Sequence, residues 1–221
     1  MLQRDIKMGF VGVTNYKKTS ERLPGKHHRV FDNGKTLVDI KLEQLFAAGA
    51  EHVYISTDDT EVSNTETITY VHRDAEYCNN VTRFTYVLEQ IYNDVPVDDK
   101  QDVVYTFVCC PLFNRYKELY DTYTHSGKNQ IAVHASTHYY LDVNKRPVNF
   151  SFGLWHPYSQ GIDPIYMFPY AGTVCKMQDL REAKYMIPEK FEYFTINQFE
   201  AIDIDVYEEY KLAQTLYYNY K

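Results

Sequence analysis

A basic loop early in the chain carries the residue types that bind phosphate groups. The segment TSERLPGK (19–26) contains Ser20, Arg22 and Lys26, and Lys17 lies just before it. Guanidinium and ammonium groups donate charge-assisted hydrogen bonds to phosphate oxygens. The proline of the segment stiffens the turn, and its glycine permits a close approach of the backbone to a ligand. These residues suit a polyphosphate site, and the alternative is a solvated basic turn.

A pair of aspartates near the other end of the chain suits a hard metal ion. In AIDID (201–205), strand alternation would put Asp203 and Asp205 on one face, with the isoleucines between them facing the core. Two such carboxylates repel by roughly 2 kcal/mol at a partly screened site. A Mg²⁺ ion would relieve that repulsion, because it takes one or two carboxylates together with phosphate oxygens. The alternative is structural: Asp205 with Glu208 would form a capping box for a following helix.

The elements that must position these residues alternate between apolar runs and segments of helical period. We expect strands at 7–14, 52–57, 68–71, 102–110, 130–137, 172–177 and 201–205, and helices at 36–48, 79–94, 114–127 and 206–221. This alternation predicts an α/β fold with an open, mostly parallel, Rossmann-like sheet and helices on both faces. Ligands of such sheets bind beyond the carboxyl ends of the strands, and the basic loop follows the first strand.

The length and composition favour one domain spanning residues 1–221. The chain is 44% hydrophobic, which suffices for a sizeable core. Between about 139 and 169 the regular pattern breaks down into aromatic, proline and glycine residues. We expect this segment to be a lid or an excursion used for dimerisation.

Net charge and cysteine usage exclude several kinds of partner and compartment. A formal charge of −7 argues against nucleic acid or an anionic membrane as the partner of the whole protein. No apolar stretch approaches the ~20 residues of a membrane helix, and the N-terminal MLQRDIKMGF lacks the features of a signal peptide. The four cysteines show no metal-ligand spacing, so reduced thiols and a cytoplasmic location are expected.

Taken in order, four segments resemble the motifs of the CMP-sugar cytidylyltransferases, the family that includes the acylneuraminate and KDO cytidylyltransferases. Residues 16–26 are similar to the opening signature AR-x-x-S-x-RLPGK, and YISTDD (54–59) to the strand-two motif VSTDD. HRDAEYCNNVT (72–82) resembles the stretch RP-x-ELA-x-D-x-AS. AIDIDVYEEYKLA (201–213) resembles the closing IDID-x-x-x-D-x-x-x-A. The matches span almost the whole chain.

The resemblance implies a Mg²⁺-dependent nucleotidyltransferase of surface-polysaccharide biosynthesis that acts as a homodimer. It would transfer CMP from CTP to an acidic small-molecule acceptor, most simply a nonulosonic, sialic-acid-like sugar, and release pyrophosphate. By the same resemblance, the triphosphate would be held by Lys17, Ser20, Arg22, Gly25 and Lys26, the metal by Asp203 and Asp205, the nucleoside by Arg73, Cys78 and Thr82, and the acceptor by Gln160, Phe191 and Phe194. Arg22, Lys26, Asp203 and Asp205 would be the catalytic groups. A surface salt bridge for Arg73 and core packing for the two phenylalanines are the structural alternatives.

The chain departs from the family pattern at positions that bear on the acceptor. Lys17 replaces an arginine, Asn80 an aspartate and Phe107 a glutamine, and Cys109 lies where KDO enzymes have a metal-binding aspartate. The last departure favours the acylneuraminate type of site. Two further hypotheses follow: a cytidylyltransferase for a phosphonate or phosphate acceptor, and a catalytically degenerate protein that only binds nucleotide.

Overall fold

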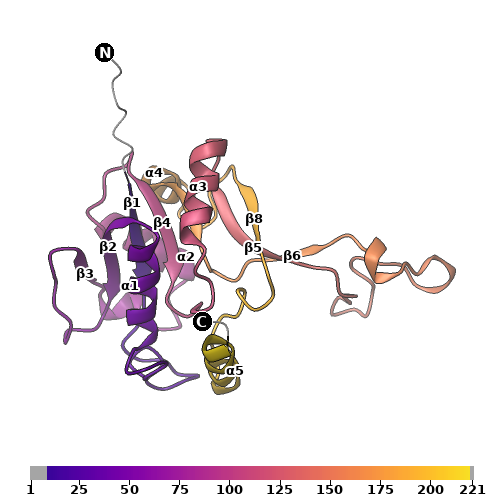
Figure 1. Cartoon of the computed structure of the whole chain (residues 1–221), viewed down its shortest axis with the longest axis horizontal. Coiled ribbons are helices and arrows are strands. Elements are labelled where there is room, and N and C mark those ends of the chain that lie inside the picture. The colour runs from indigo at the N-terminus through magenta and orange to yellow at the C-terminus, as the bar shows by residue number, and fades with distance from the viewer. Residues whose placement is uncertain (1–8, 220–221) are drawn as a thin grey trace, which may run out of the picture.

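A mixed sheet of eight strands forms the centre of the computed structural model, which describes residues 9–219 (Figure 1). The regular elements, in chain order, are β1 (Phe10–Asn15), α1 (Leu37–Ala47), β2 (Ala50–Thr57), β3 (Ile68–His72), α2 (Phe84–Asp94), β4 (Asp102–Phe107), α3 (Tyr116–Ser126), β5 (Gln130–Ser136), β6 (Ile165–Met167), β7 (Thr173–Lys176), α4 (Met177–Ala183), β8 (Glu192–Ile196) and α5 (Tyr207–Asn219). Short 3₁₀ turns occur at 75–77, 153–155 and 159–161.

The strand order places the ends of β1 and β4 side by side at one edge of the sheet. Strands β3, β2, β1 and β4 are parallel neighbours in that order. β7 continues the sheet antiparallel to β4, and β5 follows. β6 pairs antiparallel and β8 parallel with β5. The predicted open, mostly parallel α/β sheet is confirmed, and its carboxyl edge lies after β1, β2, β3 and β4.

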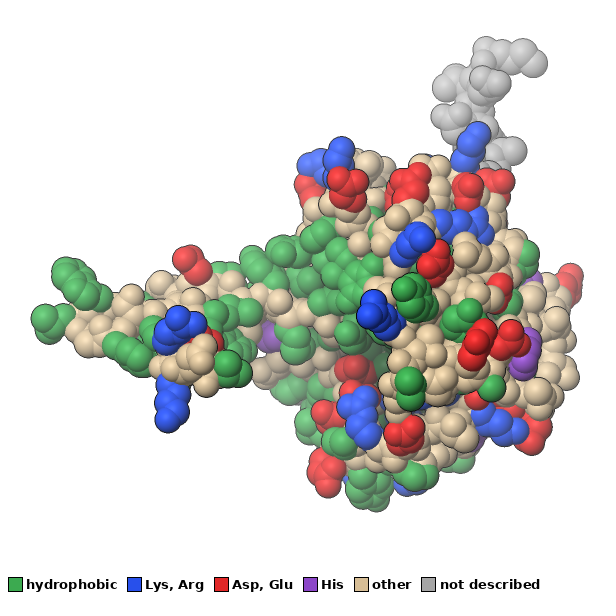
Figure 2. All heavy atoms as spheres, turned by 180° about the vertical axis from the view of Figure 1, so that it is seen from behind, with side chains coloured by type: hydrophobic (Ala, Val, Ile, Leu, Met, Phe, Trp, Pro, Cys, Tyr) green, Lys and Arg blue, Asp and Glu red, His purple; other side chains and the backbone are tan. Residues whose placement is uncertain are grey.

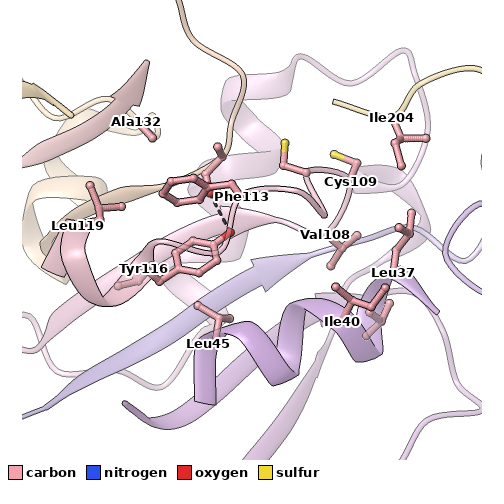
Figure 3. Packing of buried hydrophobic residues seen from close by; sticks show 14 of the residues in the cluster. Leu37, Ile40, Leu45, Val108, Cys109, Phe113, Tyr116, Leu119, Ala132 and Ile204 are labelled. Atoms are coloured by element: carbon pink, nitrogen blue, oxygen red, sulfur yellow. Dashed lines mark hydrogen bonds between the residues drawn. The ribbon is translucent and has the colours of Figure 1, made fainter. Parts of the chain in front are cut away.

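Two hydrophobic clusters cover the two faces of the sheet, as a doubly wound fold requires. One contains buried residues of α1, α3 and α5, among them Leu45 and Leu119 (Figure 3). The other contains buried residues of α2 and α4, among them Leu88 and Leu180. Side chains of β4 alternate between them, with Val104 in the first cluster and its two neighbours in the second.

The boundaries of α1 follow its sequence signals, whereas those of α2 do not. Thr36 caps α1, with reciprocal hydrogen bonds to Asp39, and Gly49 follows the helix at φ +99°. The predicted start of α2 at residue 79 is wrong, because the side chain of Asn79 accepts hydrogen bonds from the amides of Val81 and Thr82. These bonds close a local turn instead of the first turn of a helix.

The predicted strand at 201–205 is also wrong. The segment is irregular and pairs with the 108–113 loop through a single bond from the Ile204 amide to the Cys109 carbonyl, 2.9 Å long. Ile204 is buried as expected. The helix after it uses Glu209, not Glu208, as its cap: this carboxylate accepts hydrogen bonds from the amides of Asp205 and Val206.

Three elements give no clear sequence signal: β6, α4 and β8. β6 begins just after an irregular segment, residues 137–164, which extends away from the sheet and is called the arm below (Figure 1). Hydrophobic side chains are exposed along it, most fully Val143, Leu154 and Tyr158 (Figure 2). Of residues 7–14, predicted as the first strand, 7 and 8 lie outside the described residues, as does most of MLQRDIKMGF. Among the helices of residues 9–219, none is long and apolar enough to cross a membrane.

A buried lysine that contacts the 108–113 loop makes the stability of the protein depend on pH. Lys41 is fully buried in α1, where its ammonium donates to the Cys110 carbonyl at 2.9 Å and to the hydroxyl of Tyr116. Burial lowers the pKa of Lys41 from 10.5 to about 8. The folded protein therefore binds fewer protons than the unfolded chain between these two values.

Replacing Lys41 by Met should remove this pH dependence. Between pH 8 and 10 the free energy of unfolding of the wild type should rise by about 2 kcal/mol relative to Lys41→Met, because the unfolded chain retains the proton longer. Urea unfolding at both pH values measures the difference. The exposed Lys117→Met variant on α3 is the control and should parallel the wild type. Parallel curves for Lys41→Met would show that the buried ammonium does not cause this pH dependence.

Candidate functional site

A cavity of about 810 Å³ opens at the carboxyl edge of the sheet and brings most of the predicted site residues together. It is bordered by the loop after β1, by the 77–84 segment, by the end of β4 and by the 203–205 segment. The candidates that line it are Lys17, Ser20, Arg22, Lys26, Arg73, Thr82, Asp203 and Asp205. The basic loop near the start of the chain and the aspartate segment near its end thus line the same cavity.

The three candidates for acceptor binding do not line this cavity. Gln160 is exposed in the arm. Phe191 is partly exposed beside β8. Phe194 is buried in β8, where its ring lies 6.3 Å from that of Phe113 and 4.8 Å from the Arg115 guanidinium. Phe194 therefore packs in the core, which was the alternative to acceptor binding for this residue. In the described chain, none of the three lines the cavity beside the basic loop.

The basic loop and the aspartate segment are joined directly by ion pairs. The Arg22 guanidinium lies 2.7 Å from the Asp205 carboxylate, and the Lys26 ammonium lies 3.5 Å from the same oxygen. Lys26 is nearly buried and also donates to the Ile204 carbonyl at 2.7 Å. The candidate phosphate-binding cations and a candidate metal ligand therefore neutralise one another.

The motif at the end of β2 fixes the shape of the basic loop. The buried carboxylate of Asp59 accepts a hydrogen bond from the Tyr16 hydroxyl and lies 3.3 Å from both the Lys18 ammonium and His28. Asp58 accepts a hydrogen bond from the Lys18 amide at 2.6 Å. Burial opposes ionisation of Asp59, but the hydrogen bond from the Glu61 amide and the Lys18 charge still lower its pKa. Lys18 thus anchors the loop and is not one of the cavity-lining cations.

The turn of the basic loop contains a glycine of left-handed conformation and a buried histidine. Gly25 has a φ of +71°, and a side chain there would meet open space, so the requirement is conformational. His27 lines the cavity but is almost fully buried, and its Nδ1 has no partner among the described residues. Burial, and then the charges of Lys26 and its other cationic neighbours, lower the pKa of His27 to about 3. The ring is therefore neutral and adds no charge to the site at neutral pH.

Asp203 differs from Asp205 in being largely shielded from water. Its Oδ1 atom is buried and has no hydrogen-bond partner among the described residues. Burial raises the pKa of Asp203, a hydrogen bond from the Cys109 thiol lowers it, and the Asp205 charge raises it again. The net shift is upward although the Lys26 charge acts against it, so a bound metal ion would further stabilise the ionised carboxylate.

Two cysteine thiols lie next to Asp203, but they favour a structural role. The ligand atoms of Cys109, Cys110 and Asp203 lie within 4.8 Å of one another. The Cys110 thiol donates to the Pro169 carbonyl at 2.9 Å. A hydrogen bond with Cys110 and burial raise the pKa of Cys109 well above its ordinary value. A protonated thiol is a poor metal ligand, so the aspartate pair remains the better candidate.

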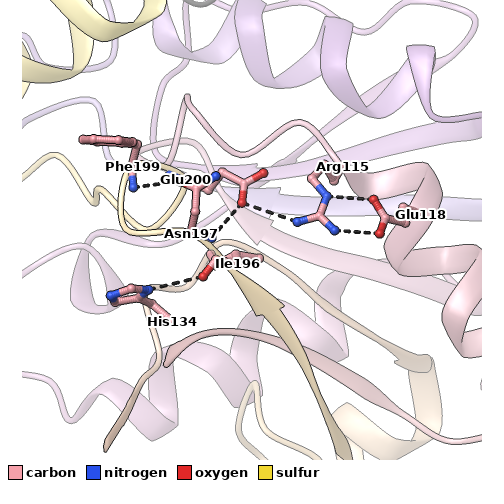
Figure 4. Close-up of polar contacts among 7 residues, drawn as sticks. All are labelled: Arg115, Glu118, His134, Ile196, Asn197, Phe199 and Glu200. Atoms are coloured by element: carbon pink, nitrogen blue, oxygen red, sulfur yellow. Dashed lines mark hydrogen bonds and ion pairs between the residues drawn. The ribbon is translucent and has the colours of Figure 1, made fainter. Parts of the chain in front are cut away.

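A polar network fixes the chain just before Asp203. Asn197 caps the turn at 197–200 by accepting hydrogen bonds from the amides of Phe199 and Glu200 (Figure 4). The Glu200 carboxylate accepts a hydrogen bond from the Asn197 amide at 2.9 Å and lies 3.5 Å from Arg115. The Arg115 guanidinium in turn donates a bidentate pair of hydrogen bonds to the Glu118 carboxylate. The start of α3 thereby positions the aspartate segment.

The far end of the cavity contains a buried arginine without a carboxylate partner. Arg73 is 2% exposed, and it donates to the Tyr16 carbonyl at 2.8 Å and to the Cys78 sulfur at 3.1 Å. No ion pair joins it to the rest of residues 9–219, so the salt-bridge alternative does not hold for this side chain. Thr82, also at this end, donates its hydroxyl to the Glu76 carbonyl. A buried guanidinium facing a cavity suits a polar ligand that accepts hydrogen bonds.

Comparison with a protein-family model now adds to this geometry. The cytidylyltransferase model matches residues 18–106, which is under half of the chain but includes the basic loop, the strand-two motif and Arg73. No curated protein matches the sequence. The family match confirms the predicted resemblance and the prediction that the protein is a nucleotidyltransferase.

Solved structures with the same fold cover nearly the whole chain. A CMP:2-keto-3-deoxy-manno-octonic acid synthetase, solved as a complex with CTP, aligns with a TM-score of 0.63 at 14% identity over 96% of this chain and 99% of its own. The 4-diphosphocytidyl-2C-methyl-D-erythritol synthase of Anaerococcus prevotii gives 0.64 at 11% identity, over 95% and 99%. The 2-C-methyl-D-erythritol 4-phosphate cytidylyltransferase of Francisella tularensis gives 0.62 at 12% identity, over 93% and 99%. At these identities the likeness establishes the fold.

Proposed function

We propose that this cytidylyltransferase, a diverged relative of the CMP-sugar enzymes, transfers CMP from CTP to a hydroxyl group of an acidic sugar and releases pyrophosphate. The observation that supports this most strongly is the single cavity in which Arg22 and Lys26 meet Asp203 and Asp205. Cations for a triphosphate and carboxylates for a divalent ion are the two charge requirements of nucleotidyl transfer. A protein that bound nucleotide without a metal ion would not need the second.

The phosphate-binding role falls to the basic loop. Lys17, Ser20, Arg22 and Lys26 line one side of the cavity, and Gly25 sets the turn between them. Binding of the triphosphate would exchange partners, because the phosphates would take Arg22 while a metal ion would take Asp205. Each charged side chain would exchange one ionic partner for another and would never be left unpaired. The free-energy cost of desolvating charges on ligand binding is therefore limited.

Asp203 and Asp205 are the residues that would hold Mg²⁺. The fit rests on the buried, unpartnered Oδ1 of Asp203 and on the oxygen-only character that Mg²⁺ prefers. When bound, the ion would neutralise charge on the α-phosphate and on the acceptor oxygen. The acceptor oxygen forms its bond to the α-phosphorus as the bond to the pyrophosphate oxygen breaks. The hydroxyl proton goes to solvent, and Arg22 and Lys26 hold the leaving pyrophosphate.

The nucleoside would occupy the end of the cavity near Arg73. Its guanidinium is buried, has no carboxylate partner among the described residues and suits the carbonyl oxygen of cytosine. Cys78 does not line the cavity and acts on the site through Arg73, to which its sulfur is hydrogen-bonded. Thr82 lies at the rim, where the ribose would lie.

Replacing Asp205 by Asn should separate chemistry from binding. We expect turnover to fall at least about a hundredfold, the cost of losing one electrostatic stabiliser of the transition state. The dissociation constant for CTP should change much less. Pyrophosphate release and calorimetric CTP binding measure the two quantities. Asp121→Asn on the surface of α3 is the matched control and should behave as the wild type; an Asp205→Asn enzyme of normal rate would contradict the metal assignment.

Replacing Arg22 by Gln should weaken CTP binding about tenfold, the value of a charge-assisted hydrogen bond to phosphate. Arg29→Gln offers a control within the same loop, because Arg29 donates to the Pro24 carbonyl and does not line the cavity. Equal CTP affinities for both variants would show that the triphosphate does not lie against Arg22.

We further propose that the protein is a homodimer joined through the arm. Leu154 and Trp155 at its outer part are 99% and 83% exposed, which is unusual for large apolar side chains of a monomer. Light scattering should give twice the chain mass of 26.1 kDa. The Leu154→Asp, Trp155→Asp double variant should lower that mass, and a monomeric wild type would contradict the proposal.

A further inference from the structure

Three aromatic rings form one wall of the cavity, called the aromatic wall below. Phe107 ends β4, Phe84 begins α2 and Tyr170 precedes β7, and all three line the cavity. The Phe107 ring lies 6.3 Å from that of Phe84 and 5.1 Å from that of Tyr170. Segments far apart in the sequence therefore contribute to one apolar surface.

The aromatic wall is rigid but not covered. Phe107 packs edge-on against Tyr105 at 5.6 Å, and its amide donates to the Tyr170 carbonyl at 3.3 Å. Tyr170 is held at a φ of +59°, which a bulky residue adopts only when its surroundings enforce it. Phe84 is nevertheless 43% exposed. Ordered aromatic rings left open to a cavity are typical of ligand-binding surfaces.

The position of the aromatic wall assigns it to the acceptor and not to the nucleoside. Phe107 lies two residues before Cys109, whose carbonyl accepts the hydrogen bond from the Ile204 amide between the two aspartates. Tyr170 lines the same cavity as the two aspartates, and burial, Tyr185 and then the aspartate charges raise the pKa of Tyr170. The Arg73 guanidinium, in contrast, donates to the Tyr16 carbonyl at the end of β1. An acceptor whose hydroxyl reaches the aspartate pair from the β4 side would lie against the wall.

A cation adjoins this wall. Arg83 lines the cavity between Thr82, where the ribose would lie, and Phe84; it is exposed and has no ion pair with a carboxylate among residues 9–219. A free guanidinium beside an apolar surface can bind a carboxylate and at the same time exclude water from the rings.

We infer that the acceptor is a hydroxy acid with an apolar face: the aromatic wall binds that face and Arg83 binds its acid group. This inference rests on the proposed function and narrows its substrate class to hydroxy acids that present an apolar face large enough to cover the three rings. The related enzymes, by the resemblance described above, have a glutamine at the position of Phe107, so the apolar preference is particular to this chain.

The test compares two probes that differ only by a phenyl group, lactate and 3-phenyllactate. Each is titrated by calorimetry into the protein with Mg²⁺ and α,β-methylene CTP, which cannot turn over, and again without nucleotide. We expect 3-phenyllactate to bind about tenfold more tightly. Phe107→Gln and, at the more exposed position, Phe84→Gln should each remove the preference, whereas Phe107→Leu should retain most of it. Arg83→Gln should weaken the binding of both probes by the same factor.

The controls separate this inference from the proposed function. Phe152→Gln, an exposed aromatic residue of the arm, should leave both affinities unchanged. Equal binding of the two probes to the wild type would overturn the inference. So would a loss of nucleotide affinity in Phe107→Gln without a change in probe preference, because the wall would then bind cytosine. Failure of the nucleotide analogue to bind the wild type would instead contradict the proposed function, while the probe preference would still decide the inference.

Discussion

The ion pairs of Asp205 with Arg22 and Lys26 are the interaction on which the site depends. They join the loop after β1 to a segment almost at the other end of the chain. In a partly buried cavity, unpaired charges of either sign would be costly. Pairing Arg22 and Lys26 with Asp205 avoids this cost. In the proposed function, a triphosphate with its metal ion would exchange with these pairs at a modest electrostatic cost.

Much of the surrounding structure holds these two segments in place. Asp59 anchors the basic loop through Tyr16 and Lys18. On the other side, Arg115 and Glu200 fix the turn before Asp203. Both groups of contacts lie at the carboxyl edge of the sheet. The basic loop and the aspartate segment are therefore each held by the fold itself as well as by the ion pairs between them. Precise placement of this kind is what catalysis by charge stabilisation requires.

The fold and the basic loop were predictable because they rest on local signals: apolar runs, helical periods and a dense group of cations with proline and glycine. That the aspartate segment and the basic loop belong to one site also followed from the resemblance, although the segment is irregular and not a strand. The anchoring role of Lys18 was not predictable, because its partner Asp59 lies far away in the sequence, in the loop after β2. The aromatic wall was missed for the same reason. Phe107 was noted only as a departure, and nothing in the sequence places it beside Phe84.

A crystal soaked with CTP and Mn²⁺ tests the central claim most directly. Manganese takes the same oxygen ligands as magnesium and reveals its position by anomalous scattering. The account predicts an anomalous peak bound by Asp203 and Asp205, with the triphosphate against Arg22 and Lys26 and the Arg22–Asp205 pair opened. A nucleotide bound elsewhere, or a triphosphate in the cavity with that ion pair intact and no metal at the aspartates, would contradict it.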